Sequence, residues 1–394
     1  MTSNQAYVVA GVRTAIGRHA GALAHVRPDD LAALVVGEAL NRAGVDPALV
    51  DEVVLGAANQ AGEDNRNVAR MAVLLAGLPH TVPGFTINRL CASGLTAVAT
   101  ARQLVLSGDA DLVVAGGVES MTRAPWVTAK PTRAFTGPGA SYDTSIGWRF
   151  PNPRFDGDTT LTMPQTAERV AERWGLSREE CDGFALRSHQ RAVAAAQAGR
   201  FAAEIVPVPV GDGQYAIDEG PRADTSAERL GGLRPLHGPG GIVTAGNSSP
   251  LNDGAAAVVV ASERFVERHS LTPRARLVAA ANVGVAPDVM GIGPVPATRK
   301  VLERAGWKVD GLDAVELNEA FACQSLACVR DLGLDEEVVN ADGGAIALGH
   351  PLGASGARIL VTLLGRLERA DARRGLATMC VGVGQGSALL VERP

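Results

Sequence analysis

Short apolar runs alternate along the first part of the chain with a longer segment of helical spacing. The runs 7–10, 52–55 and 112–115 are largely apolar and are bounded by Gly, Asp or charged residues, so they predict buried strands. Between the first two, residues 29–43 carry Leu and Val at helical spacing and end at Gly44. Strands separated by helices predict an α/β architecture with parallel strand pairing.

The second half of the chain repeats this alternation. Strands are expected over 275–279, 314–317 and 377–380, and helices near 297–305 and 355–367. The two halves also share a local motif. Ala92-Ser93-Gly94 and Ala354-Ser355-Gly356 each open an amphipathic helix, and each helix precedes a strand that ends in a Gly-rich turn. Matching order on both sides predicts an internal duplication.

The region between the halves has a different character. Residues 121–247 are rich in Pro, Gly, Arg and aromatic residues and contain helical patterns over 165–174 and 178–197. A region this long without alternating strands is unusual inside a parallel sheet, which favours an inserted lid; the alternative is a third independent domain. The expected units are 1–120 together with 248–272, the insertion 121–247, and 273–394.

Composition narrows the function and the compartment. The 37 Lys and Arg against 42 Asp and Glu give a formal charge of −5, which argues against nucleic-acid binding. Five cysteines in 394 residues do not suggest a disulfide framework and favour a reducing compartment. Residues 1–10 show no secretory signal, no uncharged apolar stretch approaches the roughly 20 residues of a membrane span, and the carboxy end matches no peroxisomal or retention signal. We therefore expect a cytoplasmic protein without membrane partners.

Cys91 lies between a predicted strand, 84–88, and a predicted helix, 92–106. At such a junction the helix dipole and free backbone N–H groups favour the nucleophilic thiolate. Gly94 would keep the first helical turn narrow enough for a substrate carbonyl. The alternative is a buried structural cysteine.

His350 lies in a glycine-rich segment, 343–356, just before a predicted helix that has Pro351 near its first turn. Dense glycine at the start of a helix indicates close backbone approach or unusual dihedral angles, both of which suit a ligand. His350 would act there as a base or a hydrogen-bond donor. The alternative is a loop histidine with only structural hydrogen bonds.

Cys380 ends a strand just before a second Gly-rich turn, 382–386. A thiol can exchange a proton with a carbon acid if its surroundings tune its pKa, and the Gly382 N–H could bind a developing oxyanion. A plain strand cysteine is the alternative.

Asn318 follows the strand 314–317 and is interpreted either as a helix N-cap or as an amide that holds a water molecule. Glu119 is expected to be a buried structural partner. No metal site is expected, because no Cys-x-x-Cys or His cluster has the spacing of zinc ligands. The remaining cysteines are interpreted as structural: Cys181, Cys323 and Cys328.

Taken together, these segments resemble the thiolase family over essentially the whole chain. The matching motifs are 88–94, 116–121, 244–247, 318–322, 343–356 and 380–386. The resemblance implies two similar α/β halves packed face to face, an inserted loop domain, and a homotetramer or homodimer. It implies an acyltransferase that uses coenzyme A and acetyl-CoA as substrates and has no permanently bound cofactor.

The resemblance also implies a role for each residue. Cys91 would carry the acyl group as a thioester, and Cys380 would protonate or deprotonate the acetyl-CoA carbon. His350 would activate thiols and, with a water molecule held by Asn318, form one oxyanion hole. The N–H groups of Cys91 and Gly382 would form the second. These roles fit the chemistry, because cleaving a carbon–carbon bond beside a ketone needs a thiolate, a site for negative charge and an acid.

Three further segments, 62–70, 145–150 and 163–167, are similar to the branch of the family that cleaves 3-oxoadipyl-CoA in aromatic-acid catabolism. That acyl chain ends in a carboxylate, so Arg66 or Arg149 could bind it by a charge-assisted pair; a surface arginine is the alternative for each.

For CoA, the resemblance implies contacts with Ser249 and Arg222, and an acyl slot lined by Met163 and Phe321. Pro250 stands where the family usually has Gly, which puts the local turn and the donor role of Ser249 in question. The rival activities are those of an acetoacetyl-CoA thiolase, a ketosynthase of the same superfamily and a non-catalytic acyl-CoA- or lipid-binding protein. Two reactive cysteines and His350 argue against the last two.

Overall fold

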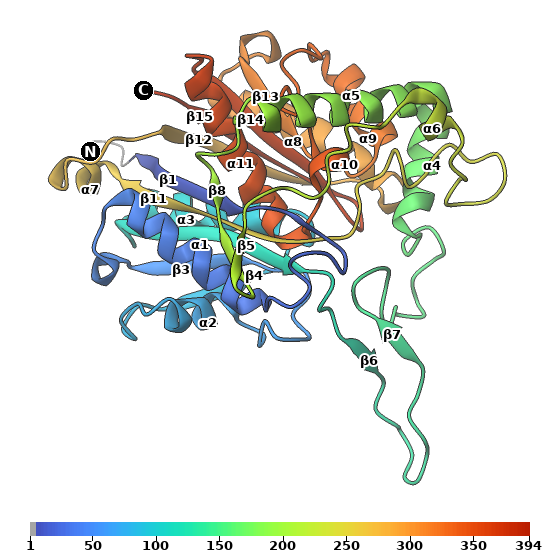
Figure 1. Ribbon diagram of the computed structural model, residues 1–394, viewed down its shortest axis with the longest axis horizontal. Coiled ribbons are helices and arrows are strands. Elements are labelled where there is room, and N and C mark those ends of the chain that lie inside the picture. The colour runs from blue at the N-terminus through green and yellow to red at the C-terminus, as the bar shows by residue number, and fades with distance from the viewer. Residues whose placement is uncertain (1–4) are drawn as a thin grey trace.

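A computed structural model describes residues 5–394 of the protein. The first four residues, part of the segment in which no secretory signal is expected, lie outside the described residues. Most of the described chain forms two groups of strands with helices on both faces (Figure 1).

The first half is a mixed sheet in which strand order differs from chain order. β3 is parallel to β4 and to β5, whereas β11 is antiparallel to β5 and to β1. In spatial order the strands are β4 (Gly84–Ile87), β3 (Glu52–Gly56), β5 (Leu112–Ser120), β11 (Asn252–Ser262) and β1 (Ala6–Thr14).

The second half has the same plan. β13 is parallel to β14, and β15 is antiparallel to both β14 and β12. The strands in order are β13 (Ala314–Leu317), β14 (Arg374–Val381), β15 (Gln385–Glu392) and β12 (Ala275–Gly284). The halves join where Tyr7 and Val8 of β1 pair with β12. The predicted duplication is therefore confirmed. The predicted parallel pairing is found for β3 with β4 and β5 and for β13 with β14. It is not found for β11 and β15, which run antiparallel to their neighbours.

The helices form layers on and between the sheets. α1 (Pro28–Ala43) and α2 (Val68–Leu75) cover the outer face of the first half, and α8 (Pro294–Ala305) and α9 (Ala322–Leu332) cover the second. α3 (Ser93–Ser107) and α11 (Leu352–Arg369) pack on each other and contact strands of both halves. Helix, sheet, helix, sheet and helix thus follow one another, which agrees with two α/β halves packed face to face.

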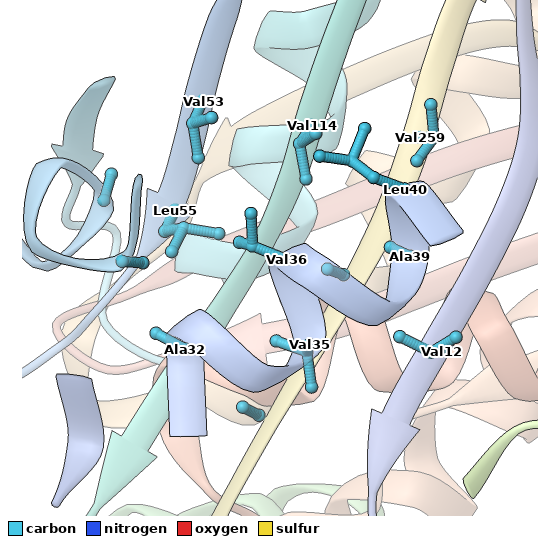
Figure 2. Close-up of a cluster of buried hydrophobic side chains, with 14 of the residues drawn as sticks. Val12, Ala32, Val35, Val36, Ala39, Leu40, Val53, Leu55, Val114 and Val259 are labelled. Atoms are coloured by element: carbon cyan, nitrogen blue, oxygen red, sulfur yellow. The ribbon is translucent and has the colours of Figure 1, made fainter. Parts of the chain in front are cut away.

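α1 illustrates why the sequence forms these elements. Pro28 occupies its first turn with Asp29 and Asp30, and Gly44 ends it in the left-handed region at φ 65°. Its apolar side chains then pack on the sheet: Figure 2 shows Val35, Val36 and Leu40 facing Val12, Val53, Leu55, Val114 and Val259.

α3 and α11 cross where both have glycine. A Cβ placed on Gly356 would lie 2.2 Å from the Leu95 backbone nitrogen, and one on Gly94 would lie 2.6 Å from the Gly353 carbonyl oxygen. The shared Ser-Gly motif therefore brings the two helix starts together. The expectation that Gly94 makes room for a substrate carbonyl is wrong, because that space is filled by α11.

The region 121–247 lies largely outside the two sheets. Only β8 joins them, through β1, while α4 and α5 pack on α9. Both helices begin with a capping box, at Thr162 and Ser177. The elements are β6 (Trp126–Thr128), β7 (Ser141–Asp143), α4 (Met163–Trp174), α5 (Arg178–Gln197), β8 (Ile205–Val206), β9 (Val208–Val210), β10 (Gly213–Tyr215) and α6 (Ala227–Gly231). Figure 1 shows the β6–β7 hairpin as an arm extending away from the body.

Shorter elements complete the chain. The remaining ones are β2 (Gly17–Arg18), α7 (Glu263–Arg268), α10 (Ala345–Leu348), and the 3-10 turns at Pro47–Leu49, Pro287–Ile292 and Val309–Gly311. One segment among the described residues, Leu90–Ser107, is long and apolar enough to cross a membrane by length and composition alone. It contains Arg102, so it is not one of the uncharged stretches considered from the sequence. It contains α3, whose apolarity is explained by its contacts with α11 and the sheets.

Candidate active site

Cys91 lies in a tight turn between β4 and α3. The Asn88 side-chain oxygen accepts the Leu90 N–H at 2.9 Å. Ser93 Oγ accepts the Arg89 N–H at 2.9 Å and donates to the Leu90 carbonyl at 2.6 Å. These bonds hold Leu90 in the left-handed region, at φ 47°. The turn therefore fixes the position of the half-buried Cys91 side chain that follows it.

The resting form of Cys91 is the neutral thiol. Burial raises its pKa to about 11, although the N–H groups of Gly382 and of Cys91 itself favour the thiolate. The backbone N–H groups therefore favour the thiolate, as expected at a helix start, but desolvation outweighs them. A base is required to make Cys91 nucleophilic at neutral pH.

His350 can be that base in the tautomer its contacts select. Its Nδ1 lies 2.6 Å from Ser355 Oγ, and the Ser355 hydroxyl donates to the Pro351 carbonyl at 3.0 Å. Both bonds form together only when Nδ1 carries the hydrogen, which leaves Nε2 with its lone pair. Burial, aided by the charge of Arg358, lowers the pKa of His350 to about 3, so the ring is neutral at pH 7.

Asn318 faces His350. Its Nδ2 lies 3.4 Å from His350 Nε2, and its Oδ1 is buried without a hydrogen-bond partner among the described residues. An orphaned acceptor beside the imidazole suits a group that holds a water molecule. The N-cap interpretation is wrong, since α9 begins at Ala322 with Phe321 as its cap residue.

Cys380 is near the end of β14, where 1% of it is exposed. Burial first, and then the nearby Cys91, raise the pKa of its thiol well above the usual value. It belongs to the same apolar cluster as Met163, Phe321 and Ile346. Both residues expected to line the acyl slot therefore lie in the cluster of the second thiol.

The turn after β14 brings the two cysteine segments together. A Cβ on Gly382 would lie 3.3 Å from Leu90 Cδ1, 3.6 Å from the Trp148 ring and 3.7 Å from Met163 Sδ. Arg89 ties the same two segments through a 2.9 Å bond to Gln385 Oε1. The Gly382 N–H beside the Cys91 thiol is thus walled by apolar side chains, where a hydrogen bond to negative charge is strong.

Two buried glutamates hold the surrounding loops. Glu119 accepts N–H groups from Ala58, Asn59 and Gly353, at 2.8–3.1 Å. Burial nevertheless raises its pKa to about 7. Glu319 accepts from Ser188, Asn340 and Ile346. These bonds agree with a structural role for Glu119.

Of the residues expected to contact CoA, Ser249 lies close to the centre of the site. Its N–H donates to the Ala320 carbonyl at 2.9 Å, beside Phe321. The hydroxyl has no hydrogen-bond partner among the described residues. Arg222 is exposed, and its backbone N–H donates to His189 Nδ1 at 3.2 Å. Two residues before it lies Gly220, on which a Cβ would come within 2.1 Å of the carbonyl oxygen of Ala347 in α10.

The two arginines proposed for the substrate carboxylate differ. Arg66 is exposed, at φ 66° in the loop before α2, and its side chain makes no hydrogen bond or ion pair with the described residues. Arg149 is half-buried, follows Trp148 and donates to Asn59 Oδ1 at 3.2 Å. The structure brings Arg149, but not Arg66, into contact with residues around the cysteine turn.

Two residues of the site were missed from the sequence. Ser355 sets the tautomer of His350, and a hydroxyl in the first turn after a histidine was a signal available in the motif. Trp148 walls the Gly382 turn, but no periodicity connects it with Gly382, because they come from different units.

The arrangement combines a thiol that needs a base, a neutral imidazole, a second buried thiol and backbone donors aimed at the first thiol. Within residues 5–394 no group of three or more His, Cys, Asp or Glu side chains could hold a metal ion, and all five cysteines are free. Acyl transfer through a thioester is the chemistry that such a set supports.

Comparison with known proteins gives the class of protein. Residues 6–264 match the family model for the thiolase N-terminal domain and residues 271–393 the one for the thiolase C-terminal domain. The chain belongs to the thiolase family, whose members of this type are acyltransferases.

Individual members of the family are similar to this chain over nearly its whole length. The chain is 56% identical to the beta-ketoadipyl-CoA thiolase of Pseudomonas aeruginosa, over 99% of this chain and 100% of that one. It is 53% identical to the 3-oxoadipyl-CoA/3-oxo-5,6-dehydrosuberyl-CoA thiolase of Escherichia coli K12, over 99% of each. The human mitochondrial 3-ketoacyl-CoA thiolase in complex with CoA superposes with a TM-score of 0.93 at 39% identity, over 99% of this chain and 98% of that one.

Proposed function

We propose that this protein cleaves 3-oxoadipyl-CoA with coenzyme A to give succinyl-CoA and acetyl-CoA, through an acyl-enzyme on Cys91. The observation that carries the proposal is the position of the Cys91 thiol. It lies beside the Gly382 N–H, and it is close enough to Cys380 to raise the pKa of that second thiol. Full-length identity of more than half to proteins of that named activity supports the substrate.

In the first half-reaction, His350 Nε2 takes the proton of the Cys91 thiol. The thiolate attacks the C3 ketone, and the charge on its oxygen is stabilised by the N–H groups of Cys91 and Gly382. The C2–C3 bond then breaks, which leaves a succinyl thioester on Cys91 and the enolate of acetyl-CoA. The thioester oxygen of that enolate binds the new Nε2–H and a water molecule held by Asn318, and its carbon takes the proton of Cys380.

In the second half-reaction, the Cys380 thiolate takes the proton of coenzyme A. The CoA thiolate attacks the succinyl thioester and releases succinyl-CoA. Cys91 leaves as a thiolate and recovers its proton from His350. Cys91 thus recovers the proton that it lent to His350, and the proton that Cys380 gave to acetyl-CoA is replaced by that of coenzyme A. Two acyl transfers through one cysteine predict ping-pong kinetics.

Mass spectrometry tests the proposed intermediate. Wild-type protein mixed with the acyl-CoA should carry the acyl mass on Cys91, and Cys91→Ser should carry none. Cys380→Ser should still be acylated from a simple acyl-CoA but should not exchange the carbon–carbon bond. A label on any other cysteine would overturn the assignment of the nucleophile. A kcat/KM higher for acetoacetyl-CoA than for 3-oxoadipyl-CoA would overturn the substrate but not the acyl transfer.

The proposal includes a homodimer or homotetramer. β4 is an edge strand with no partner on its outer side among the described residues, and Phe85, Leu74 and Leu75 are exposed there. The β6–β7 arm exposes Trp126 and Phe135, and a lone hairpin is only marginally stable. Light scattering after gel filtration should give twice or four times the chain mass; a monomer would refute this part.

We also propose that the protein acts in the cytoplasm and needs no bound cofactor besides its substrates. Five unpaired cysteines, two of them in the proposed mechanism, support a reducing compartment. Cell fractionation tests the first statement. Full activity after dialysis against a chelator tests the second.

A further inference from the structure

The acyl group of the proposed substrate ends in a carboxylate, three carbons beyond the carbonyl that Cys91 attacks. A carboxylate that enters an apolar slot must find a cation or donors there, or it keeps its water and binds poorly. The walls around Gly382, formed by Leu90, Trp148 and Met163, are apolar. The cation must therefore come from a residue next to these walls.

Two series of contacts connect Arg149 with this slot. Its neighbour Trp148 contacts the Gly382 turn, and the Trp148 indole N–H donates to the Leu161 carbonyl at 3.0 Å, close to Met163. Its guanidinium donates to Asn59, whose neighbour Ala58 accepts the Asn88 amide at 2.9 Å. Asn88 in turn fixes the turn that carries Cys91. One series of contacts ends at the Gly382 turn and the other at the turn that carries Cys91.

The Arg149 side chain has donors to spare. Its one hydrogen bond to a described residue uses Nη1, and it forms no ion pair with a carboxylate of residues 5–394. The buried carboxyl of Asp64 is close enough to feel the charge of Arg149. Burial, the larger effect, raises the pKa of Asp64, and Arg149 lowers it. The half-buried guanidinium thus has no direct ion pair with any residue that the structure describes.

Other arginines differ from Arg149 in their partners or their exposure. Arg89 donates through Nε to Thr96 and through Nη1 to Gln385. Arg358 is buried opposite Glu316, at 3.9 Å. Arg66 is exposed, and its side chain makes no hydrogen bond or ion pair with the described residues.

We propose that Arg149, positioned by Asn59, binds the terminal carboxylate of the acyl group and selects dicarboxylic 3-oxoacyl-CoA substrates. This inference rests on the proposed thiolase function and names the residue behind its specificity. Asn59 is itself fixed by a 2.8 Å bond to Thr144 and by its N–H to Glu119. The guanidinium therefore meets the carboxylate from a fixed position, which favours a bidentate pair.

The test compares 3-oxoadipyl-CoA with 3-oxohexanoyl-CoA, which has a methyl group in place of the carboxylate. We expect Arg149→Met to lower kcat/KM for 3-oxoadipyl-CoA by about 10- to 100-fold, as for loss of a charged hydrogen bond, and to change the value for 3-oxohexanoyl-CoA less than about threefold. Arg149→Lys should restore part of the loss. The KM for CoA should stay the same.

Arg154→Met is the matched control, because Arg154 is an exposed arginine of the same segment. It should leave both substrates unchanged. Equal losses on both substrates in Arg149→Met, or a selective loss in Arg66→Met instead, would overturn the role of Arg149 while the thiolase function stands. A wild-type protein that shows no preference for 3-oxoadipyl-CoA would overturn the proposed substrate and the role of Arg149 together.

Discussion

Replacing Gly356 by Ala should separate the two helix starts that carry the catalytic residues. The new Cβ would lie 2.2 Å from the Leu95 nitrogen and 2.6 Å from Leu95 Cβ. Carbon contacts are normally about 3.5–4.0 Å, so α3 and α11 must move apart by roughly 1 Å. Such overpacking typically costs about 1–3 kcal/mol, and more when backbone must shift, against about 1 kcal/mol gained by removing a helical glycine.

Gly183→Ala is the matched control. Gly183 lies inside α5, and a Cβ there meets no atom within 4 Å. It should therefore gain about 0.5–1 kcal/mol of stability from the helix alone. In urea unfolding at one protein concentration, the free energy of unfolding of Gly356→Ala should be about 2–4 kcal/mol lower than that of Gly183→Ala.

Activity gives a second measure of the same displacement. Cys91 precedes α3 and His350 precedes α11, so separating the helices moves the nucleophile away from its base. A misplacement of about 1 Å can cost on the order of 100-fold in rate. The effect of an ordinary surface substitution on the free energy of unfolding is roughly 0.5 kcal/mol. If the free energy of unfolding of Gly356→Ala differs from that of wild type by no more than this, and the variant keeps full activity, the close contact does not set the geometry of the site.

Two further predictions concern the histidines. Ser355→Ala removes the partner of His350 Nδ1 and should lower kcat by about 10- to 100-fold, whereas Ser355→Thr keeps a hydroxyl and most of the rate; equal rates in both variants would refute the tautomer argument. Burial lowers the pKa of His189 from its usual 6.5 to about 4, so its neutral form contributes stability above pH 6.5 that is lost as the pH falls toward 4. At pH 5 the loss in the free energy of unfolding is roughly 2 kcal/mol. His189→Asn has no charge to gain, so its free energy of unfolding in urea should fall correspondingly less between pH 7 and pH 5. Equal falls in the variant and the wild type would contradict this role of His189.

Local sequence patterns predicted the strands and helices but not their directions. The run at 112–115 and the helix at 29–43 appear as β5 and α1. β11 was not predicted to lie between β1 and β5, because it follows the whole inserted region. Periodicity reports which residues are buried and does not report which distant strand completes the sheet.

For the candidate site, too, the sequence predicted some features and not others. Residue chemistry drew attention to Cys91, His350 and Cys380. The backbone N–H groups favour the Cys91 thiolate, as expected, but burial of the thiol outweighs them. A helix start could be read from sequence, but the loss of water around the thiol could not.

The duplication explains why the site has a single nucleophile although the fold repeats. The strand after each central helix begins at Leu112 and at Arg374, at the same distance along the chain from Ser93 and Ser355, so Cys91 has Gly353 as its counterpart.

A Cβ on Gly353 would lie 2.5 Å from the Val118 carbonyl oxygen and 2.8 Å from the Gly56 carbonyl oxygen. No side chain fits there without moving β3 or β5. The same packing that brings the second helix start against the first therefore excludes a second nucleophile from the equivalent position. The second half instead contributes His350 and Cys380, which stand where the first half has Asn88 and Val118, to one shared site.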